Sequence, residues 1–253
     1  MLISRKFLPS LFTVLNAFCG FMSIIFAAKG DFTNACLFII YASLFDAVDG
    51  LAARLTNSAS QFGVELDSLS DVISFGAAPS FLLYNIYMDQ LGDIGIVLSS
   101  LLMVFAALRL ARFNVQLVGF DKNKFNGLPV PMAAMTIVSY ILFYHDKIFS
   151  SSVSEIVLIV LSILLPILMV SKFQYDSLPK PSLYAIKKNP VIFIVVIIAL
   201  ILTLWTKGEG SFAFCLIYIF TGIVRSIKDL IFRKRRISSE DFPGEELGLK
   251  ETK

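Results

Sequence analysis

The sequence predicts an all-α membrane protein, a bundle of helices that crosses the bilayer several times. Hydrophobic residues make up 57% of its 253 residues, charged residues only 16%, and the mean hydropathy is +0.78. A soluble domain carries about 25% charged residues. The apolar residues form continuous runs of roughly 20, long enough for membrane helices, and lack the period-two alternation of membrane barrel strands.

The first apolar run, residues 8–28, follows Arg5 and Lys6 and begins like a signal peptide. It is too long for the hydrophobic part of such a peptide and has no convincing cleavage site, so we expect a retained span. A window of about 20 residues places the other helices. The eight expected spans are 8–28, 33–53, 62–84, 94–115, 130–145, 153–171, 190–206 and 211–228.

Lysine and arginine are distributed unevenly between alternate loops. With the N-terminus in the cytoplasm, the outside loops contain only Lys29, Lys147 and Lys207. The positive-inside rule therefore predicts a multi-pass protein of the cytoplasmic membrane with both termini and the Arg54 loop inside. We expect four units: a six-helix core (1–171), a basic loop (172–189), a transmembrane hairpin (190–232) and a polybasic segment with a flexible tail (233–253).

Four carboxylates lie at helical spacing in the second and third spans. Asp46 and Asp49 are three residues apart, and Asp67 and Asp71 are four apart, so each pair shares one helix face. The short polar turn 56–61 joins the two helices as a hairpin, which brings both pairs together near the cytoplasmic boundary. Four unpaired acids at the bilayer centre would oppose insertion by roughly 10 kcal/mol. Hard divalent cations, which take oxygen ligands, would compensate them.

Small and basic residues accompany the acids. Gly50 and Gly63 stand where a side chain would keep a helix or ligand at a distance. Arg54 offers a planar fork of donors that suits phosphate oxygens. The combination indicates a diphosphate site with one or two Mg²⁺-like ions, used for transfer between phosphorus and oxygen. Neither a Walker loop nor a GxGxxG motif occurs, and we expect no nucleic-acid partner.

Written with their gaps, the residues of the site form the pattern Asp46-x2-Asp49-Gly50-x2-Ala53-Arg54-x8-Gly63-x3-Asp67-x3-Asp71. At all eight fixed positions the pattern resembles the signature of the CDP-alcohol phosphotransferase family of integral membrane enzymes. The resemblance implies a six-helix core, a homodimer, two Mg²⁺ or Mn²⁺ ions held by the four aspartates, and Asp71 as general base. It assigns the CDP diphosphate to Asp49, Gly50, Ala53, Arg54, Gly63 and Asp67.

Further segments resemble one branch of this family, the bacterial phosphatidylserine synthases of the membrane type. These segments are 9–21, 74–79, 109–114 and 125–131. The resemblance implies transfer of the phosphatidyl group from CDP-diacylglycerol to the hydroxyl of L-serine, with release of CMP. Because this hydroxyl is a weak nucleophile, a carboxylate must take its proton as the new bond forms, which suits Asp71.

Residues outside the signature are candidates for binding the acceptor. Arg109 and Arg112 lie three residues apart at the inner end of the fourth span, where they could hold serine's carboxylate or the lipid phosphate. Positive-inside anchoring is their alternative role. Ser74 and Asn114 are candidates for contacts with the polar groups of serine.

Three other functions are alternatives. One keeps the fold and uses glycerol 3-phosphate or an inositol phosphate as acceptor, which should require a denser cationic pocket. Another is a divalent-cation transporter, because intramembrane carboxylates often line ion paths. Clustering of the acids near one face, beside Arg54, disfavours transport. The third is a catalytically silent binding protein, which the complete signature disfavours.

Overall fold

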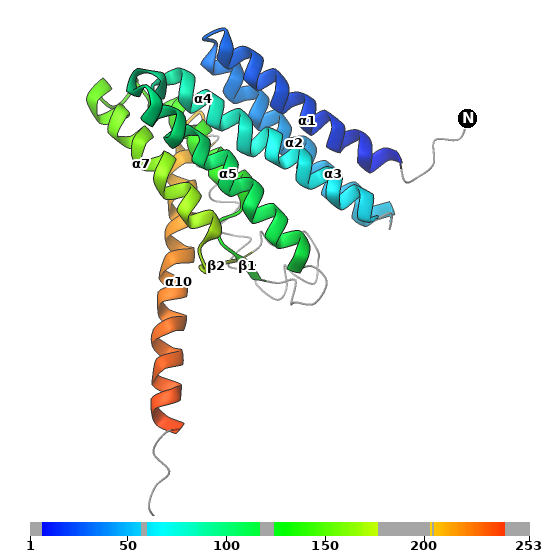
Figure 1. Cartoon of the computed structure of the whole chain (residues 1–253), viewed down its shortest axis with the longest axis vertical. Helices are drawn as coiled ribbons and strands as arrows, with labels where there is room; N and C mark the ends of the chain where they lie inside the picture. Colours follow the sequence, from blue (N-terminus) through cyan, green and yellow to red (C-terminus); the bar gives the residue numbers. More distant parts are fainter. Residues whose placement is uncertain (1–6, 57–59, 117–123, 177–202, 204, 241–253) are drawn as a thin grey trace, which may run out of the picture.

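The computed structural model describes residues 7–56, 60–116, 124–176, 203 and 205–240 (Figure 1). Helices account for nearly all of this part of the chain, and two very short strands lie in connecting segments. The elements are α1 (Phe7–Ala28), α2 (Phe32–Thr56), α3 (Gln61–Asp71), η1 (Val72–Ala77), α4 (Ala78–Ile86), η2 (Met88–Leu91), α5 (Asp93–Gln116), β1 (Lys124–Asn126), α6 (Val130–Phe143), α7 (Ser151–Val170), β2 (Gln174–Asp176) and α10 (Gly210–Glu240).

The described helices confirm the predicted fold class, a polytopic helical membrane bundle. Those long and apolar enough to cross a membrane are Ser10–Ala28, Phe32–Ala52, Asp93–Val115 and Ser151–Val170. Two shorter apolar helices, Val130–Phe143 and Gly210–Ser226, match the fifth and eighth expected spans. The seventh, 190–206, lies almost entirely outside the described residues.

The third expected span, 62–84, is a continuous helical run that changes geometry at its centre. It begins after the N-cap Ser60, whose hydroxyl oxygen accepts a hydrogen bond of 3.1 Å from the backbone N–H of Gly63. α3 ends at Asp71, and the six-residue η1 that follows is a π-helix, which continues into α4. Asp71 therefore stands at the junction between α-helical and π-helical geometry, a kind of irregularity that often occurs at functional sites.

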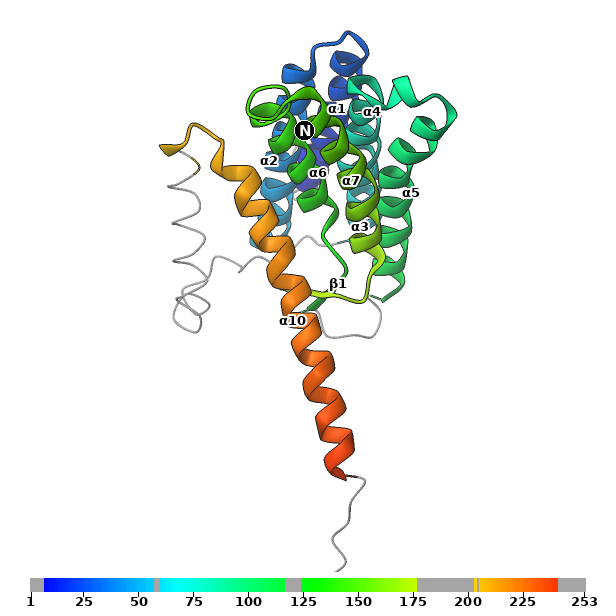
Figure 2. The same cartoon turned by 90° about the vertical axis from the view of Figure 1, so that its left-hand side faces the viewer.

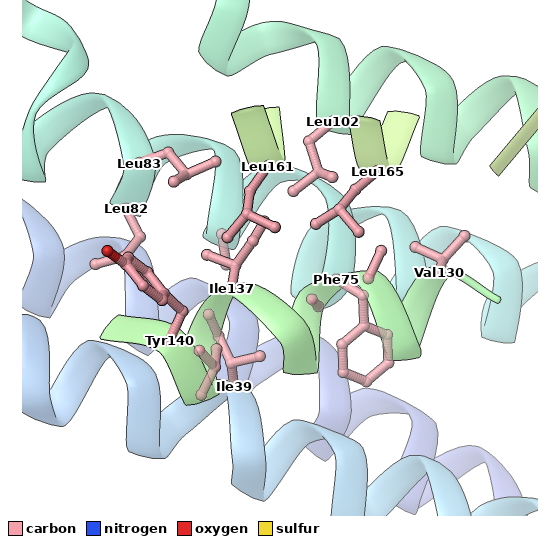
Figure 3. Close-up of a cluster of buried hydrophobic side chains, with 14 of the residues drawn as sticks. Ile39, Phe75, Leu82, Leu83, Leu102, Val130, Ile137, Tyr140, Leu161 and Leu165 are labelled. Atoms are coloured by element: carbon pink, nitrogen blue, oxygen red, sulfur yellow. The ribbon is translucent and has the colours of Figure 1, made fainter. Parts of the chain in front are cut away.

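The core lies where α6 is enclosed by its neighbours (Figure 3). Ile137 and Tyr140 of α6 have no exposed surface, and they meet Ile39 of α2, Leu82 of α4 and Leu165 of α7 in one apolar cluster. A helix that is apolar on all sides suits an enclosed position or the bilayer interior. The burial of α6 explains how a helix of 14 residues takes part in the bundle although it is shorter than its neighbours.

α1 lies along α2 and also packs against α3, η1 and α4 (Figure 1). The two elements approach closely at Gly20, where an added Cβ would lie 2.5 Å from Oγ and 2.7 Å from Cα of Ser74. Small residues permit such proximity between membrane helices. The contact holds the first helix of the chain against the segment that follows Asp71.

β1 and β2 form an antiparallel ribbon in which Phe125 pairs with Tyr175. The ribbon joins the segment before α6 to the segment after α7. Gly127 adopts a φ of +83°, and an added Cβ would lie 2.0 Å from the backbone oxygen of Met169. Glycine is therefore required for this close, left-handed turn.

α10 packs against α6 and β2 and then protrudes beyond the rest of the bundle (Figure 2). It reaches Glu240, well past residue 228, where we expected the last span to end. The polybasic run that we placed after the hairpin therefore continues the helix. Lys and Arg are good helix formers, and no Gly or Pro occurs between Gly222 and Pro243.

Candidate active site

Three carboxylates from the α2–α3 hairpin form the centre of the candidate site. Asp46, Asp67 and Asp71 each place one carboxylate oxygen within 4.8 Å of the others. Asp71 is buried, with 7% of its surface exposed, and the other two are partly buried. The two helices thus bring their acids together as the spacing predicts. We call these three residues the acid triplet.

Asp49 lies beside the acid triplet rather than within it. It is buried and accepts a hydrogen bond from the hydroxyl of Thr13 on α1. Asp49 also interacts electrostatically with Asp46 and Asp67, so its charge acts on the same centre. α1 therefore orients Asp49, the one acid of the pattern that lies outside the acid triplet.

Asn16 is a polar residue of the site that our sequence reasoning did not assign. It has no exposed surface, and its amide Nδ2 donates a hydrogen bond of 3.2 Å to Oδ1 of Asp71. Thr13 lies three residues earlier on the same face of α1, and its backbone oxygen accepts a hydrogen bond of 3.0 Å from Ser70 Oγ. Two polar residues at this spacing in a predominantly apolar helix were the signal that could have identified them.

Arg109 is a buried cation near the acids. Only 7% of its surface is exposed, and its guanidinium interacts electrostatically with Asp71 and with Tyr218 of α10. Arg112, three residues later on α5, is exposed. Of the two arginines singled out from the sequence, the structure brings Arg109 to the acid triplet.

Ser74 and Asn114 make hydrogen bonds within the protein. Oγ of Ser74 donates to the backbone oxygen of Asn16 at 2.8 Å. Nδ2 of Asn114 lies 3.0 Å from Oγ of Ser68 and 3.3 Å from Oε2 of Glu65. These bonds link helices, and the expected contacts of Ser74 and Asn114 with serine stay predictions.

The remaining signature residues lie around the hairpin. Gly50 is exposed on α2. A Cβ added at Gly63 would meet, among the described residues, only Oγ of Ser60 at 3.2 Å. The backbone beside the acids is therefore accessible. Ala53 and Arg54 belong to the last turns of α2, and their side chains lie outside what the structure describes.

The ligand atoms of the acid triplet fit a hard divalent cation. All are carboxylate oxygens, the donors that Mg²⁺ and similar ions prefer, and they converge from two helices on one point. Like charges this close are unfavourable unless protons or a cation neutralise them. The cluster is therefore compatible with a bound divalent metal ion.

Comparisons with known proteins identify the family of the chain. A family model described as CDP-alcohol phosphatidyltransferase matches residues 6–170. The chain is 37% identical over 231 residues to the CDP-diacylglycerol–serine O-phosphatidyltransferase of Helicobacter pylori. The aligned residues make up 90% of this chain and 95% of the relative. The chain belongs to the CDP-alcohol phosphatidyltransferase family.

Two further relatives widen the comparison. The archaetidylserine synthase of Methanothermobacter thermautotrophicus is 42% identical over 170 residues, 66% of this chain and 69% of the relative. The CDP-diacylglycerol–serine O-phosphatidyltransferase of Bacillus subtilis is 33% identical over 175 residues, 69% of this chain and 93% of the relative. The family resemblance that the eight-position pattern carries is thereby confirmed.

Proposed function

We propose that the protein transfers the phosphatidyl group of CDP-diacylglycerol to the hydroxyl of L-serine and releases CMP. The names of the relatives support serine as acceptor. One observation carries the chemical argument. Asp71 is a buried carboxylate within the acid triplet, and a side-chain N–H from another helix binds one of its oxygens, which leaves the second oxygen for a substrate.

Asp71 acts as the general base in this proposal. Its carboxylate accepts the proton of the serine hydroxyl while the serine oxygen forms a bond to the phosphorus of the lipid phosphate. The bond from that phosphorus to the oxygen of the diphosphate bridge breaks, and CMP leaves. A positioned base of this kind typically contributes 10²- to 10⁴-fold to a rate.

The acids also hold the divalent metal, which we propose is a pair of Mg²⁺ or Mn²⁺ ions. Bound metal would supply Lewis-acid stabilisation of the charge on the phosphoryl oxygens. The metal is assigned to the acid triplet together with Asp49, whose charge acts on the same centre. The CDP diphosphate is assigned to Asp49, Gly50, Ala53, Arg54, Gly63 and Asp67.

Arg109 is the proposed partner of the serine carboxylate. Its guanidinium is buried beside Asp71, so a serine whose hydroxyl meets the base can present its carboxylate to this cation. The exposed Arg112 suits the lipid phosphate or the membrane surface instead. A buried arginine next to the acids also disfavours the alternative of a cation path, because it repels the ion to be transported.

An apolar groove on the two helices that carry Asn16 and Asp49 supports a lipid donor. Its volume is about 390 Å³, and it lies between α1 and α2 with Phe12 and Leu15 on one wall and Tyr41, Leu44 and Val48 on the other. Val48 directly precedes Asp49 in the chain. We assign the groove to an acyl chain of CDP-diacylglycerol, whose polar head would then reach the acids from the side of the bilayer.

We further propose that the protein is a homodimer of the cytoplasmic membrane with its acids facing the cytoplasm. The unequal distribution of Lys and Arg between alternate loops supports this orientation. The division into a core (1–171), a basic loop, a hairpin and a tail stays a prediction alongside it. The match of the family model to residues 6–170 supports the first boundary.

The test of the function is an acceptor assay. Purified protein receives CDP-diacylglycerol, Mg²⁺ or Mn²⁺, and labelled L-serine, and we expect equal amounts of CMP and labelled phosphatidylserine. Parallel reactions contain glycerol 3-phosphate or inositol phosphate instead. Product formed only with a phosphorylated alcohol would overturn serine as the acceptor and keep the family. Absence of CMP with every acceptor would overturn the transferase proposal.

A further inference from the structure

Asn16 lies at the centre of the contact between α1 and the third span. Its side chain is completely buried, and its Nδ2 lies 3.2 Å from Oδ1 of Asp71. Its backbone oxygen accepts the hydroxyl hydrogen of Ser74 at 2.8 Å. Gly20, one turn further along α1, makes room for Ser74. The position of the Asn16 amide relative to Asp71 is therefore fixed through both main chain and side chain.

The chemistry of Asp71 decides how the Asn16 amide is turned. An ionised carboxylate only accepts hydrogen bonds, so the amide must present its NH₂ group and not its oxygen. The amide oxygen Oδ1 consequently points elsewhere. It is buried and has no hydrogen-bond partner among the residues that the structure describes. Buried acceptors without a donor are rare in native proteins and call for a ligand or water.

The donor that the Asn16 oxygen lacks matches a group of the acceptor. L-Serine carries its hydroxyl and its ammonium group on adjacent carbon atoms. If Asp71 accepts the hydroxyl proton, the ammonium group must lie next to Asp71 and needs an acceptor there. Oδ1 of Asn16 belongs to the amide that is bonded to Asp71, so it satisfies this requirement.

We propose that Asn16 recognises the ammonium group of the acceptor through Oδ1 while its Nδ2 orients Asp71. The inference rests on the proposed function, since it takes Asp71 as the base and serine as the substrate. It assigns the buried amide two separable effects. Loss of the oxygen weakens serine binding, and loss of the N–H slows proton transfer at Asp71.

The experiment compares serine with 3-hydroxypropanoate, which has the same hydroxyl and carboxylate but no ammonium group. In Asn16→Leu, which keeps the branched outline and removes both polar atoms, we expect the KM for serine to rise about tenfold to a hundredfold, as for loss of a charge-assisted hydrogen bond. The inhibition constant of 3-hydroxypropanoate should change less than about threefold. The KM for CDP-diacylglycerol should stay unchanged.

Asn16→Asp separates the two ends of the amide and has nearly the same shape. Its carboxylate still accepts from an ammonium group but donates nothing to Asp71 and repels its charge. We expect the KM for serine to stay within about threefold of the native value while kcat falls at least tenfold. This variant decides the question if Asn16→Leu does not fold.

The control is Ser23→Ala on the same helix. Ser23 is also fully buried and its hydroxyl has no hydrogen-bond partner among the described residues, but it lies about 10 Å further along α1. Its substitution should change neither KM nor kcat. An equal loss of affinity for serine and 3-hydroxypropanoate in Asn16→Leu would overturn the inference. An increase in the half-saturating Mg²⁺ concentration of Asn16→Leu would also overturn it, because that result would make Oδ1 a metal ligand.

The two proposals fail in different ways. If the native protein forms no phosphatidylserine under any of the conditions of the acceptor assay, the proposed function is wrong. If the native protein forms it and Asn16→Leu loses no discrimination for the ammonium group, the function stands and the role of Asn16 is wrong.

Discussion

Tyr175 of β2 stacks on Tyr218 of α10, with ring centroids 5.6 Å apart and ring planes inclined by 28°. Gly222, one turn after Tyr218, allows this contact, because an added Cβ would lie 2.1 Å from the Tyr175 ring. The stack attaches α10, which follows the part matched by the family model, to the ribbon and hence to the core. Tyr218 in turn interacts electrostatically with Arg109, so α10 reaches the surroundings of the acids.

The Tyr175 hydroxyl predicts a change of stability in alkaline solution. Burial raises the pKa of Tyr175 to about 12, because the ionised phenol is poorly solvated there. The stability that the neutral phenol contributes is complete below pH 10 and is lost as the pH rises through 12. Relative to Tyr175→Phe, the free energy of unfolding of the native protein should fall by on the order of 2 kcal/mol between pH 10 and pH 12. Denaturant unfolding from pH 9 to 12 measures the difference.

Parallel stability curves for the native protein and Tyr175→Phe from pH 9 to 12 would contradict the burial of the Tyr175 hydroxyl.

Gly20→Ala should weaken the contact between α1 and η1. The added methyl would meet Oγ and Cα of Ser74 at 2.5 and 2.7 Å, so the helices must separate. Overpacking of this kind typically costs about 1–3 kcal/mol. Thermal unfolding in detergent measures the loss, and Gly63→Ala is the control because its Cβ would meet no backbone atom among the described residues, only Oγ of Ser60 at 3.2 Å. An unchanged unfolding temperature in Gly20→Ala would be inconsistent with the described packing.

Asp71→Asn should abolish turnover while the protein stays folded. Asparagine cannot accept the proton of serine, and loss of a general base should lower kcat by about 10²- to 10⁴-fold. Binding of CDP-diacylglycerol should be retained in part, since Asp46 and Asp67 remain. Asp89→Asn, at an exposed position in η2, is the matched control. Near-native kcat in Asp71→Asn would remove the proposed base.

Chelation of divalent cations should abolish the binding of CDP-diacylglycerol as well as its turnover. The acid triplet and a diphosphate are all negatively charged and repel each other without a cation between them. We expect at least a hundredfold weaker binding in excess EDTA, with recovery on addition of Mg²⁺ or Mn²⁺. Equilibrium binding of labelled CDP-diacylglycerol gives the readout. Undiminished binding in EDTA would show that the diphosphate is held without metal.

Cysteine labelling should place the two ends of α7 on opposite sides of the membrane. The three native cysteines, Cys19, Cys36 and Cys215, are free and buried, so their background reaction is low. In intact cells a membrane-impermeant maleimide should label Ser152→Cys at the start of α7. Lys172→Cys, just beyond the end of α7, should react only after lysis. The reverse pattern would invert the proposed orientation.

Much of the helix arrangement follows from the sequence because membrane helices need long apolar runs. The third span, for example, was expected over 62–84 and extends over Gln61–Ile86. The π-helix within it could not be predicted, since η1 depends on contacts such as the hydrogen bond from Ser74 to Asn16 on another helix. The extent of α10 was underestimated because a hydropathy window ends where charge begins, whereas a charged helix can continue into water.

The acids of the site were predictable, and their partners on α1 were not. The spacing of Asp46, Asp67 and Asp71 within one hairpin is local information that indicates convergence. The hydrogen bonds from Thr13 to Asp49 and from Asn16 to Asp71 join residues 36 and 55 positions apart, and no local pattern specifies which distant residue meets which acid. The polar pair on α1 signals that a partner exists, but only the fold identifies it.

The π-helix has a consequence for anyone who extrapolates helix faces through the third span. Each π-turn accommodates about one residue more than an α-turn, and one residue corresponds to roughly 100° of rotation. A helical wheel drawn from Asp67 through to Leu82 and Leu83 would therefore misassign the apolar side of α4 by about that angle. Deleting one residue from Val72–Ala77 should let the segment run as an α-helix with Leu82 and Leu83 still facing the interior of the protein, because the π-turn accommodates that one residue.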